Sequence, residues 1–561
     1  MVITSEAIRS FKVQLQQAVI ICSERCLFNS AKWACEILDG IKDELLDTKI
    51  PFTNNDVHLK VVSTYHTDYE SSLPPLSEYE YNKYQFAKTL FQMRQFDRVR
   101  DVLGDSKSSK LYFLRLYARY LSGEKHKEEL TQDILNSKED NTAENPELNS
   151  IYEELSEDYE KDNLDAFTLY LYGIVLKRRK SSLKAATVLL KSIQAYEFNW
   201  SAWMELASLI ENRKMFIDIQ NLLNRNFRGS IMKNLFFTKL CIDLYQPIEL
   251  FRTFMSPLHR YFPNSAYILS QCAILFYDNM EYNESLYFFE ELRRLHPSRL
   301  EDMDIYSNLL HLRMAKDKLC ILALECDRID KYTPEACCVK ANYYNLKGEI
   351  PESIEYFKRA LKLNRSYLLA WILLGHDYIE LKDTSVAIEC YRRAISIDNR
   401  DYRAWYGLGQ AFEVRKLPNE AVYYYQKATD FRPTDARMWK VLATCYGALG
   451  RGNDVEYCNR KAIICEDEVD STATIQLGRI FQEMGKIHVA IPYYHKIWEQ
   501  SNKLSNITDE LAEISICLAK FAVNESNFSE AKKYANTALN SRYPYHEEAR
   551  QILDRISENL H

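Results

Sequence analysis

Three tryptophans in the C-terminal half of the chain begin the same pattern of apolar and small residues. Trp371 is followed by Leu374 and Gly375, and the spacing recurs behind Trp405 and Trp439, so that the pattern has a period of 34 residues. An apolar residue at i, i+3 and i+7 forms one stripe along a helix. A second apolar stripe, rich in alanine, follows in each period, and the chain therefore predicts pairs of consecutive helices.

Small residues within each period indicate how the two helices of a pair touch. If the tryptophan is counted as position 4, glycine or alanine stands at position 8 and an aromatic ring at position 24. The small residue lets the helices approach closely, and the ring fills the remaining hole. This is the tetratricopeptide pattern. Its anchors at position 4 are Leu169, Trp203, Leu269, Met303, Cys337, Trp371, Trp405, Trp439 and Thr474, with a degenerate repeat near Phe237.

The expected fold is all-α, a right-handed α-solenoid (superhelix) of about 13 tetratricopeptide helical hairpins in which each repeat touches only its neighbours. Helices are expected at 5–22, 27–46 and within 147–161. The predicted domains are an N-terminal repeat-like region (1–121), an acidic loop between repeats (122–165), middle repeats with one degenerate member (166–265), a C-terminal superhelix with a peptide groove (266–544) and a closing helix (545–561).

Composition agrees with a long helical stack, because only 14 glycines and 14 prolines occur among 561 residues. The net charge is −7, and residues 137–163, with ten acidic residues and two lysines, carry −8 of it. The rest of the chain is nearly neutral, which predicts no binding to nucleic acid or to a membrane. No secretory signal or membrane span is expected. The simplest interpretation of the acidic segment is a solvated loop, with partner binding left open.

The motifs of catalysis and cofactor binding do not occur, so the sequence predicts no enzyme, no catalytic residue, no cofactor and no metal site. The 14 cysteines form no paired zinc frame and predict free, mostly buried thiols in a reducing compartment. Cys337 and Cys338 occupy core positions of a helix. Tyr425 is the expected core aromatic of its repeat, which disfavours interpreting Tyr423–Tyr425 as a base-stacking platform.

The concave face of the stack is the remaining candidate site. Positions 9, 12 and 13 of the first helix of each repeat tend to line it. The candidate peptide-binding residues there are Asn308, His311, Asn342, Asn345, His376, Glu380, Gln410 and Glu413. Amide and imidazole groups can bind an extended backbone, and Glu380 and Glu413 can pair with an arginine. A merely hydrated face stays open as an alternative.

Position 5 tests a second function class, a free-standing adaptor or co-chaperone. Cys338, Ile372, Tyr406 and Lys440 stand there, which departs from the Lys/Asn/Asn/Lys/Arg clamp of co-chaperone repeats. A third class, an enzyme fused to repeats, is disfavoured because the repeats extend almost to the last residue given. The adaptor therefore remains the alternative to weigh.

Several stretches outside the repeat consensus match a known family. They include RYLSGEK and NRDYRAWYGLGQ, and the matching segments are 25–38, 78–91, 112–125, 169–176, 299–310, 329–344, 359–388 and 400–413. These segments resemble the cell division cycle protein twenty-three family, subunit eight of the anaphase-promoting complex/cyclosome. The likeness runs from about 25 to 545, and the acidic region 126–165 departs from it in detail.

The resemblance implies a non-catalytic scaffold of a multisubunit E3 ubiquitin ligase that controls mitotic progression by ubiquitinating mitotic cyclins and securin. It implies a homodimer formed through the N-terminal repeats, stacking with sister tetratricopeptide subunits, and a small accessory subunit along the solenoid. It also implies that the C-terminal groove takes the arginine-containing C-box motif of a coactivator, near Asn342 and Glu380. The expected location is the nucleus and cytoplasm.

Overall fold

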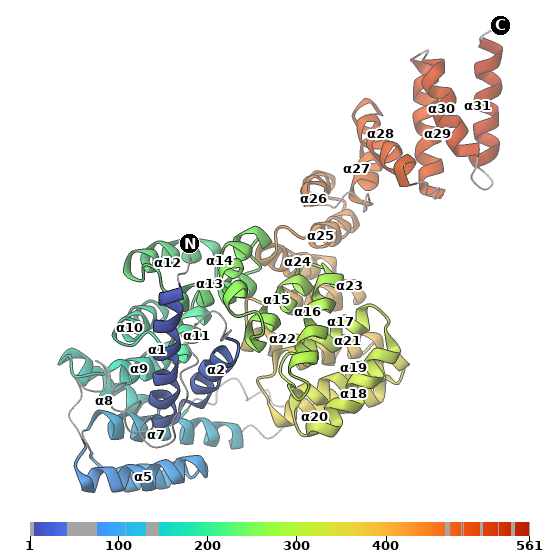
Figure 1. Cartoon of the computed structure of the whole chain (residues 1–561). Coiled ribbons are helices and arrows are strands. Elements are labelled where there is room, and N and C mark those ends of the chain that lie inside the picture. Colours follow the sequence, from blue (N-terminus) through green and yellow to red (C-terminus); the bar gives the residue numbers. More distant parts are fainter. Residues whose placement is uncertain are drawn as a thin grey trace. The chain divides into compact units, whose positions relative to one another are not determined.

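The fold is all-α, as predicted. A computed structural model describes residues 5–41, 76–106, 108–130, 145–465, 472–483, 485, 487–504, 509–525, 527–539 and 545–559. These residues form 29 helices and, within those ranges, no strand (Figure 1). The chain divides into two compact units, 1–370 and 371–561, and the division falls inside the expected C-terminal superhelix.

The helices of the first unit follow one another along the chain, and from α9 onward they form pairs joined by short turns. They are α1 (Ser5–Glu24), α2 (Phe28–Asp39), α5 (Glu78–Gln92), α6 (Phe96–Leu103), α7 (Ser109–Leu130), α8 (Leu148–Glu160), α9 (Ala166–Arg178), α10 (Ser182–Ala195), α11 (Trp200–Ser208), α12 (Arg213–Asn226), α13 (Ile231–Asp243), α14 (Ile248–Tyr261), α15 (Ala266–Asp278), α16 (Tyr282–Leu295), α17 (Met303–Leu312), α18 (Lys316–Asp330), α19 (Pro334–Lys347) and α20 (Ile350–Leu363). The degenerate repeat is α13 with α14.

The second unit continues the same succession of pairs. It comprises α21 (Leu368–Glu380), whose first turn belongs to the first unit, α22 (Thr384–Ile397), α23 (Tyr402–Val414), α24 (Pro418–Phe431), α25 (Ala436–Ala448), α26 (Gly452–Cys465), α27 (Thr472–Glu483), α28 (Ile487–Leu504), α29 (Asp509–Asn524), α30 (Phe528–Leu539) and α31 (Tyr545–Asn559). The last helix lies where the closing helix is expected.

The close approach predicted within each repeat is confirmed. A Cβ atom added at Gly375 would lie 2.6 Å from the ring of Tyr391, and one at Gly409 would lie 2.5 Å from the ring of Tyr425. Both rings are fully buried. In these two repeats the ring at position 24 packs directly on the backbone of position 8, where a Cβ atom would have no room.

The N-terminal pair of helices departs from the expected stack. Besides contacting α1, α2 contacts both α11 and α15, although each repeat was expected to touch only its neighbours. Trp33 of α2 stacks on Trp200 of α11 with ring centroids 4.2 Å apart and planes 5° from parallel, and Tyr267 of α15 meets Trp33 edge-on. Both tryptophans are buried, and burying two large stacked rings stabilises this contact between repeats that are not neighbours.

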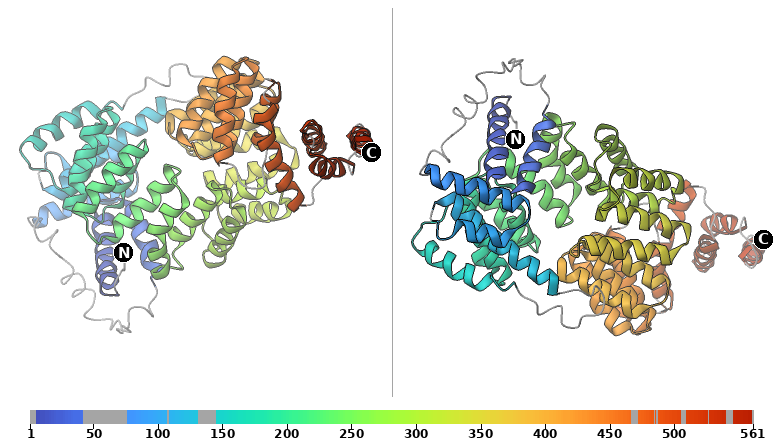
Figure 2. Two further views of the ribbon diagram at one scale, coloured as in Figure 1. Left: turned by 90° about the horizontal axis from the view of Figure 1, so that it is seen from above. Right: turned by 90° about the horizontal axis from the view of Figure 1, so that it is seen from below.

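Polar contacts fix the same arrangement. The Ser30 hydroxyl donates to Asn199 at 3.2 Å, and Arg299 pairs with Glu36 of α2 at 2.8 Å. Figure 1 shows α2 beside α11, and both views of Figure 2 keep α1 and α2 beside the green helices of the first unit. The N-terminal pair therefore covers one face of the repeats that follow it.

This cover explains an unusual burial pattern. In α9 every residue from 166 to 176 is buried, and in α15 every residue from 266 to 275 is buried except Tyr267, which is half-buried. A helix with only one covered face alternates buried and exposed positions at its own period. These helices are covered on several faces at once, in part by residues of α1 and α2.

The acidic loop is shorter than the expected 122–165. Helix α7 continues to Leu130, and α8 fills most of 147–161, as the pattern there predicts. Arg119 of α7 pairs with Glu147 and Glu154, at 2.9 and 3.1 Å. These carboxylates are bound by arginine and do not belong to a solvated loop. Residues 131–144 and the connection 47–75 lie outside the described residues.

Candidate functional site

The candidate residues of the first unit lie on α17 and α19, and their hydrogen bonds join neighbouring repeats. The Asn308 amide donates to the Tyr277 hydroxyl at 2.9 Å. His311 and Asn345 form a hydrogen bond of 2.7 Å across the two helices. Within this unit the structure thus brings the two residues at position 12 together.

Asn342 is less accessible than its position predicts. It is only 4% exposed, and its amide nitrogen donates to the Ser307 hydroxyl at 2.8 Å. The bond joins position 9 of one repeat to position 8 of the preceding one. Asn342 consequently stabilises the contact between repeats and presents little polar surface to a ligand.

A buried carboxyl lies beside these residues on α17. Asp304 is buried and accepts a hydrogen bond of 2.6 Å from the hydroxyl of Tyr367. Burial raises the pKa of Asp304 to about 7, the Tyr367 hydroxyl opposes that rise, and the nearby Asp302 and Glu335 add to it. This side of α17 therefore carries less negative charge at neutral pH than its acidic residues indicate.

The candidate residues of the second unit lie on α21 and α23, where two of them contact a buried tyrosine. The Tyr391 hydroxyl lies 2.8 Å from Nδ1 of His376, and the Tyr425 hydroxyl donates to Glu413 at 2.7 Å. Burial, with the nearby charge of Arg403, lowers the pKa of His376 to about 4. The imidazole is therefore neutral at pH 7 and serves as a hydrogen-bonding group without charge.

The carboxylates of α21 and α23 and the amide of Gln410 are more accessible to solvent. Glu380 and Glu413 are exposed, and Gln410 is half-buried. Gln410 has no hydrogen bond to any other described residue. A carboxylate offers about four acceptor sites, so Glu413 can hold the Tyr425 hydroxyl and still accept from an arginine.

A third hydroxyl of the same kind identifies a polar residue that the sequence reasoning missed. Tyr494 packs on Gly478, and its hydroxyl donates to Gln482 at 2.9 Å. Gln482 stands at position 12 of its repeat, as Glu413 does. A tyrosine at position 24 above a glycine at position 8 is the sequence signal that could have found it.

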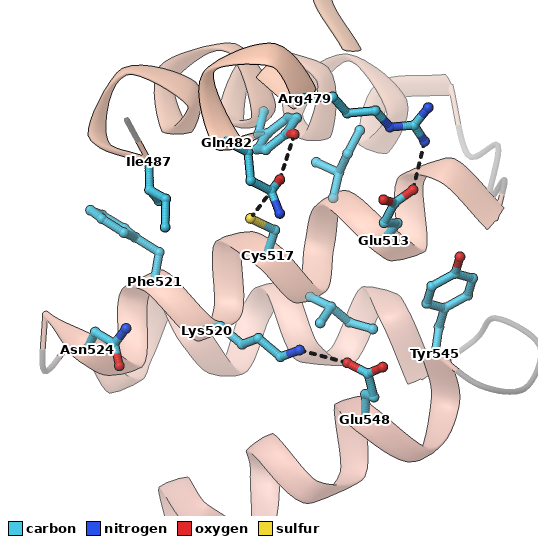
Figure 3. Close-up of a pocket in the computed structure, with 13 residues that line it drawn as sticks. Arg479, Gln482, Ile487, Glu513, Cys517, Lys520, Phe521, Asn524, Tyr545 and Glu548 are labelled. Carbon is cyan, nitrogen blue, oxygen red and sulfur yellow. Dashed lines mark hydrogen bonds and ion pairs between the residues drawn. The ribbon is translucent and has the colours of Figure 1, made fainter. Parts of the chain in front are cut away.

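Gln482 borders a cavity of about 310 Å³ between α27, α29 and α31 (Figure 3). Two ion pairs flank it: Arg479 with Glu513 at 2.7 Å, and Lys520 with Glu548 at 2.8 Å. Both pairs join one first helix to the next. No feature of the sequence predicts a cavity here, because its presence depends on the angles between helices.

Possible metal ligands are scattered over the parts of the chain that the structure describes. No three histidine, cysteine or acidic side chains lie close enough there to hold a metal ion. All 14 cysteines are free and ten are buried, as predicted, including Cys337 and Cys338. The described helices also include none that is long and apolar enough to cross a membrane.

Comparison with known proteins covers nearly the whole chain. Residues 10–273 match the family model described as anaphase promoting complex subunit 8 / Cdc23, and residues 334–367 and 372–436 match tetratricopeptide models. Anaphase-promoting complex subunit 8 of Arabidopsis thaliana is 41% identical, with 97% of this chain and 96% of that protein covered. Anaphase-promoting complex subunit CDC23 of Saccharomyces cerevisiae is 34% identical, with 97% of each covered.

One solved structure supports the fold. The crystal structure of the APC/C hetero-tetramer Cut9-Hcn1 matches with a TM-score of 0.52 and 14% identity, covering 84% of this chain and 89% of that one. At this identity the match concerns the arrangement of helices alone, which is that of a tetratricopeptide protein.

Proposed function

Because this chain belongs to the family of anaphase-promoting complex subunit 8 (Cdc23), we propose that it is a non-catalytic tetratricopeptide scaffold subunit of that complex, a multisubunit E3 ubiquitin ligase. The observation that carries the proposal is the 41% identity that extends over 97% of the chain. The helical repeats provide surface for other subunits, and the proposed role in mitotic progression is that of the assembled ligase.

The proposed partners follow from the family and from the two units. Residues 1–121 would form the homodimer, and the repeats would contact sister tetratricopeptide subunits and a small accessory subunit. The proposed location is the nucleus and cytoplasm. The free-standing adaptor has no specific observation in its favour.

The proposed ligand of the α21–α23 face is the C-box motif of a coactivator. Glu380 and Glu413 are exposed carboxylates, and a guanidinium can bind a carboxylate through two parallel hydrogen bonds. His376 and Gln410 would bind the backbone of the same peptide. Neutral His376 avoids repulsion of the incoming arginine, which supports a basic ligand on this face.

Affinity purification of the tagged full chain, followed by mass spectrometry, tests the scaffold role. The other subunits of the complex are the expected co-purifying proteins, and recovery of chaperones without any of them would exclude the proposal. Sedimentation of the purified chain tests the dimer separately. A monomer at all concentrations would remove the proposed homodimer and leave the family assignment unaffected.

A further inference from the structure

The cavity between α27, α29 and α31 has no role in the function proposed above. Its lining comes from α27, α29 and α31 and, through Ile487 and Tyr494, from α28, and it does not include residues of the α21–α23 face. We propose that it is a second peptide-binding site, which takes one uncharged, apolar side chain from an extended segment of another protein. This inference does not depend on coactivator binding.

The charges around the cavity favour an uncharged occupant. Arg479 of α27 forms an ion pair with a glutamate of α29, and Lys520 of α29 forms one with a glutamate of α31 (Figure 3). The charged side chains of the lining therefore sum to zero. A charged side chain entering the cavity would lose its water without gaining an unpaired counter-ion. An apolar side chain pays no such cost and leaves both pairs intact.

The cavity has room for an apolar side chain together with part of its backbone, and apolar residues form much of its walls. Its volume of about 310 Å³ is at the lower end for ligand sites, which typically span roughly 300–1,000 Å³. Ile487 and Phe521 form one wall, and Tyr545 lies on the opposite side (Figure 3). Ile487 is 41% exposed, which is a large fraction for an isoleucine beside a cavity. Covering it with an apolar partner would stabilise the complex.

Gln482 supplies a donor of fixed orientation for a peptide backbone. Its Oε1 atom accepts from the Tyr494 hydroxyl at 2.9 Å and from the Cys517 thiol at 3.7 Å. In this orientation the amide nitrogen faces the other way, and it has no hydrogen bond to any described residue. Asn524 at the far end likewise makes none. Two amides flanking an apolar cavity suit an extended backbone with one buried side chain.

Binding of defined peptides to the full chain tests the proposal. The probes are short, blocked Ser/Gln peptides, labelled with a fluorophore, that differ only in a central Leu, Phe, Asp or Lys, and fluorescence anisotropy measures their affinity. The Leu or Phe peptide is expected to bind about tenfold more tightly than the charged ones. Bound peptide should also slow alkylation of Cys517, whereas exposed Cys35 serves as the internal reference.

A matched pair of variants separates this cavity from general surface effects. Ile487→Glu places a charge in the wall and should abolish the preference for Leu and Phe. Val489→Glu changes an equally exposed residue of the same helix (42% against 41%), outside the lining, and should leave it unchanged. Equal affinity for all four peptides, or a preference that survives Ile487→Glu, overturns the proposal. If no peptide binds and Ile487→Glu alters the sedimentation of the full chain, the cavity joins two copies instead.

Discussion

Helices α15 and α23 occupy the same place in their repeats, yet one is covered and the other is partly open. Between 266 and 275 all residues of α15 but one are buried. In α23 the buried residues follow the packing stripe, and Arg403, Gln410 and Glu413 are at least partly exposed. Both sequences carry small and apolar residues at the consensus positions. What differs is the N-terminal pair, which contacts α15 through α2.

The repeat pattern specifies which residues pack within the stack. It does not specify whether the remaining face of each helix is covered or stays accessible. In the first unit that face buries Trp33 and Trp200 and packs them against the half-buried Tyr267. In α23 it carries Gln410 and Glu413, which are suited to a ligand. One face has therefore become core and the other a candidate binding surface.

The largest effect is expected from uncovering the first unit. Trp33→Ala removes the ring stacked on Trp200 and should lower the free energy of unfolding of this unit by about 3–5 kcal/mol. Chemical denaturation followed by circular dichroism measures the change. Phe28→Ala, on the same helix but 46% exposed, is the control and should cost less than about 1 kcal/mol. Equal effects of the two changes would mean that α2 is not held by its tryptophan.

The open face is tested by removing its carboxylates. Glu380→Ala combined with Glu413→Ala should weaken an arginine-containing C-box peptide by about 2 kcal/mol or more, because the guanidinium loses its charged partners. Calorimetric titration of the full chain gives the affinity. Glu420→Ala, an exposed glutamate of the following helix, should have no effect. Unchanged affinity of the double variant would remove this face from the proposed function.

The packing rule common to both regions is tested at Gly409. Gly409→Ala puts a methyl group 2.5 Å from the Tyr425 ring and should destabilise the second unit by about 1–3 kcal/mol. Adding Tyr425→Leu should recover part of the loss, because another repeat already combines Ala207 at position 8 with Leu223 at position 24, and both are buried. Gly447→Ala, where no atom lies within 4 Å, should be neutral or stabilising. Thermal unfolding of the three variants gives the comparison.

The smallest effect is expected at the repeat that breaks the rule. Asn459 stands at position 24 of its repeat, is 0% exposed, and neither polar atom of its amide has a hydrogen-bond partner. Asn459→Leu removes this desolvated amide and should stabilise the second unit by about 1 kcal/mol. Replacing exposed Asn419 by leucine is the control, with no expected gain. A loss of stability at Asn459 would show that its amide does have a partner in solution.

The sequence predicts contacts between residues that lie within one repeat. The spacing behind Trp371 and Trp405 predicts the helix pairs and the contacts of Gly375 and Gly409, because those contacts lie within one period of the chain. The same spacing places His376 and Glu413 on one face of their helices. It does not predict that tyrosine hydroxyls bond to them. These bonds form because the tyrosine at position 24 lies opposite the first helix of the same repeat.

Contacts between distant repeats could not be predicted in this way. Trp33 and Trp200 lie far apart in the chain and meet only in the folded structure, and a single sequence shows no period that relates them. Asn342 is a second example. Its position predicts an amide that a ligand can reach, whereas in the structure this amide donates a hydrogen bond to Ser307. The cavity beside Gln482 likewise depends on the angle between helices.

The sequence by itself determined the helical repeat, its register, the residues that pack within each pair, and the family. These features depend on contacts between residues close in the chain, whose geometry a fixed period dictates. Only the tertiary structure decided which face is covered by α2, which polar groups are already bonded and where a cavity remains. These outcomes depend on small angles added over many helices, and the sequence period contains no record of them.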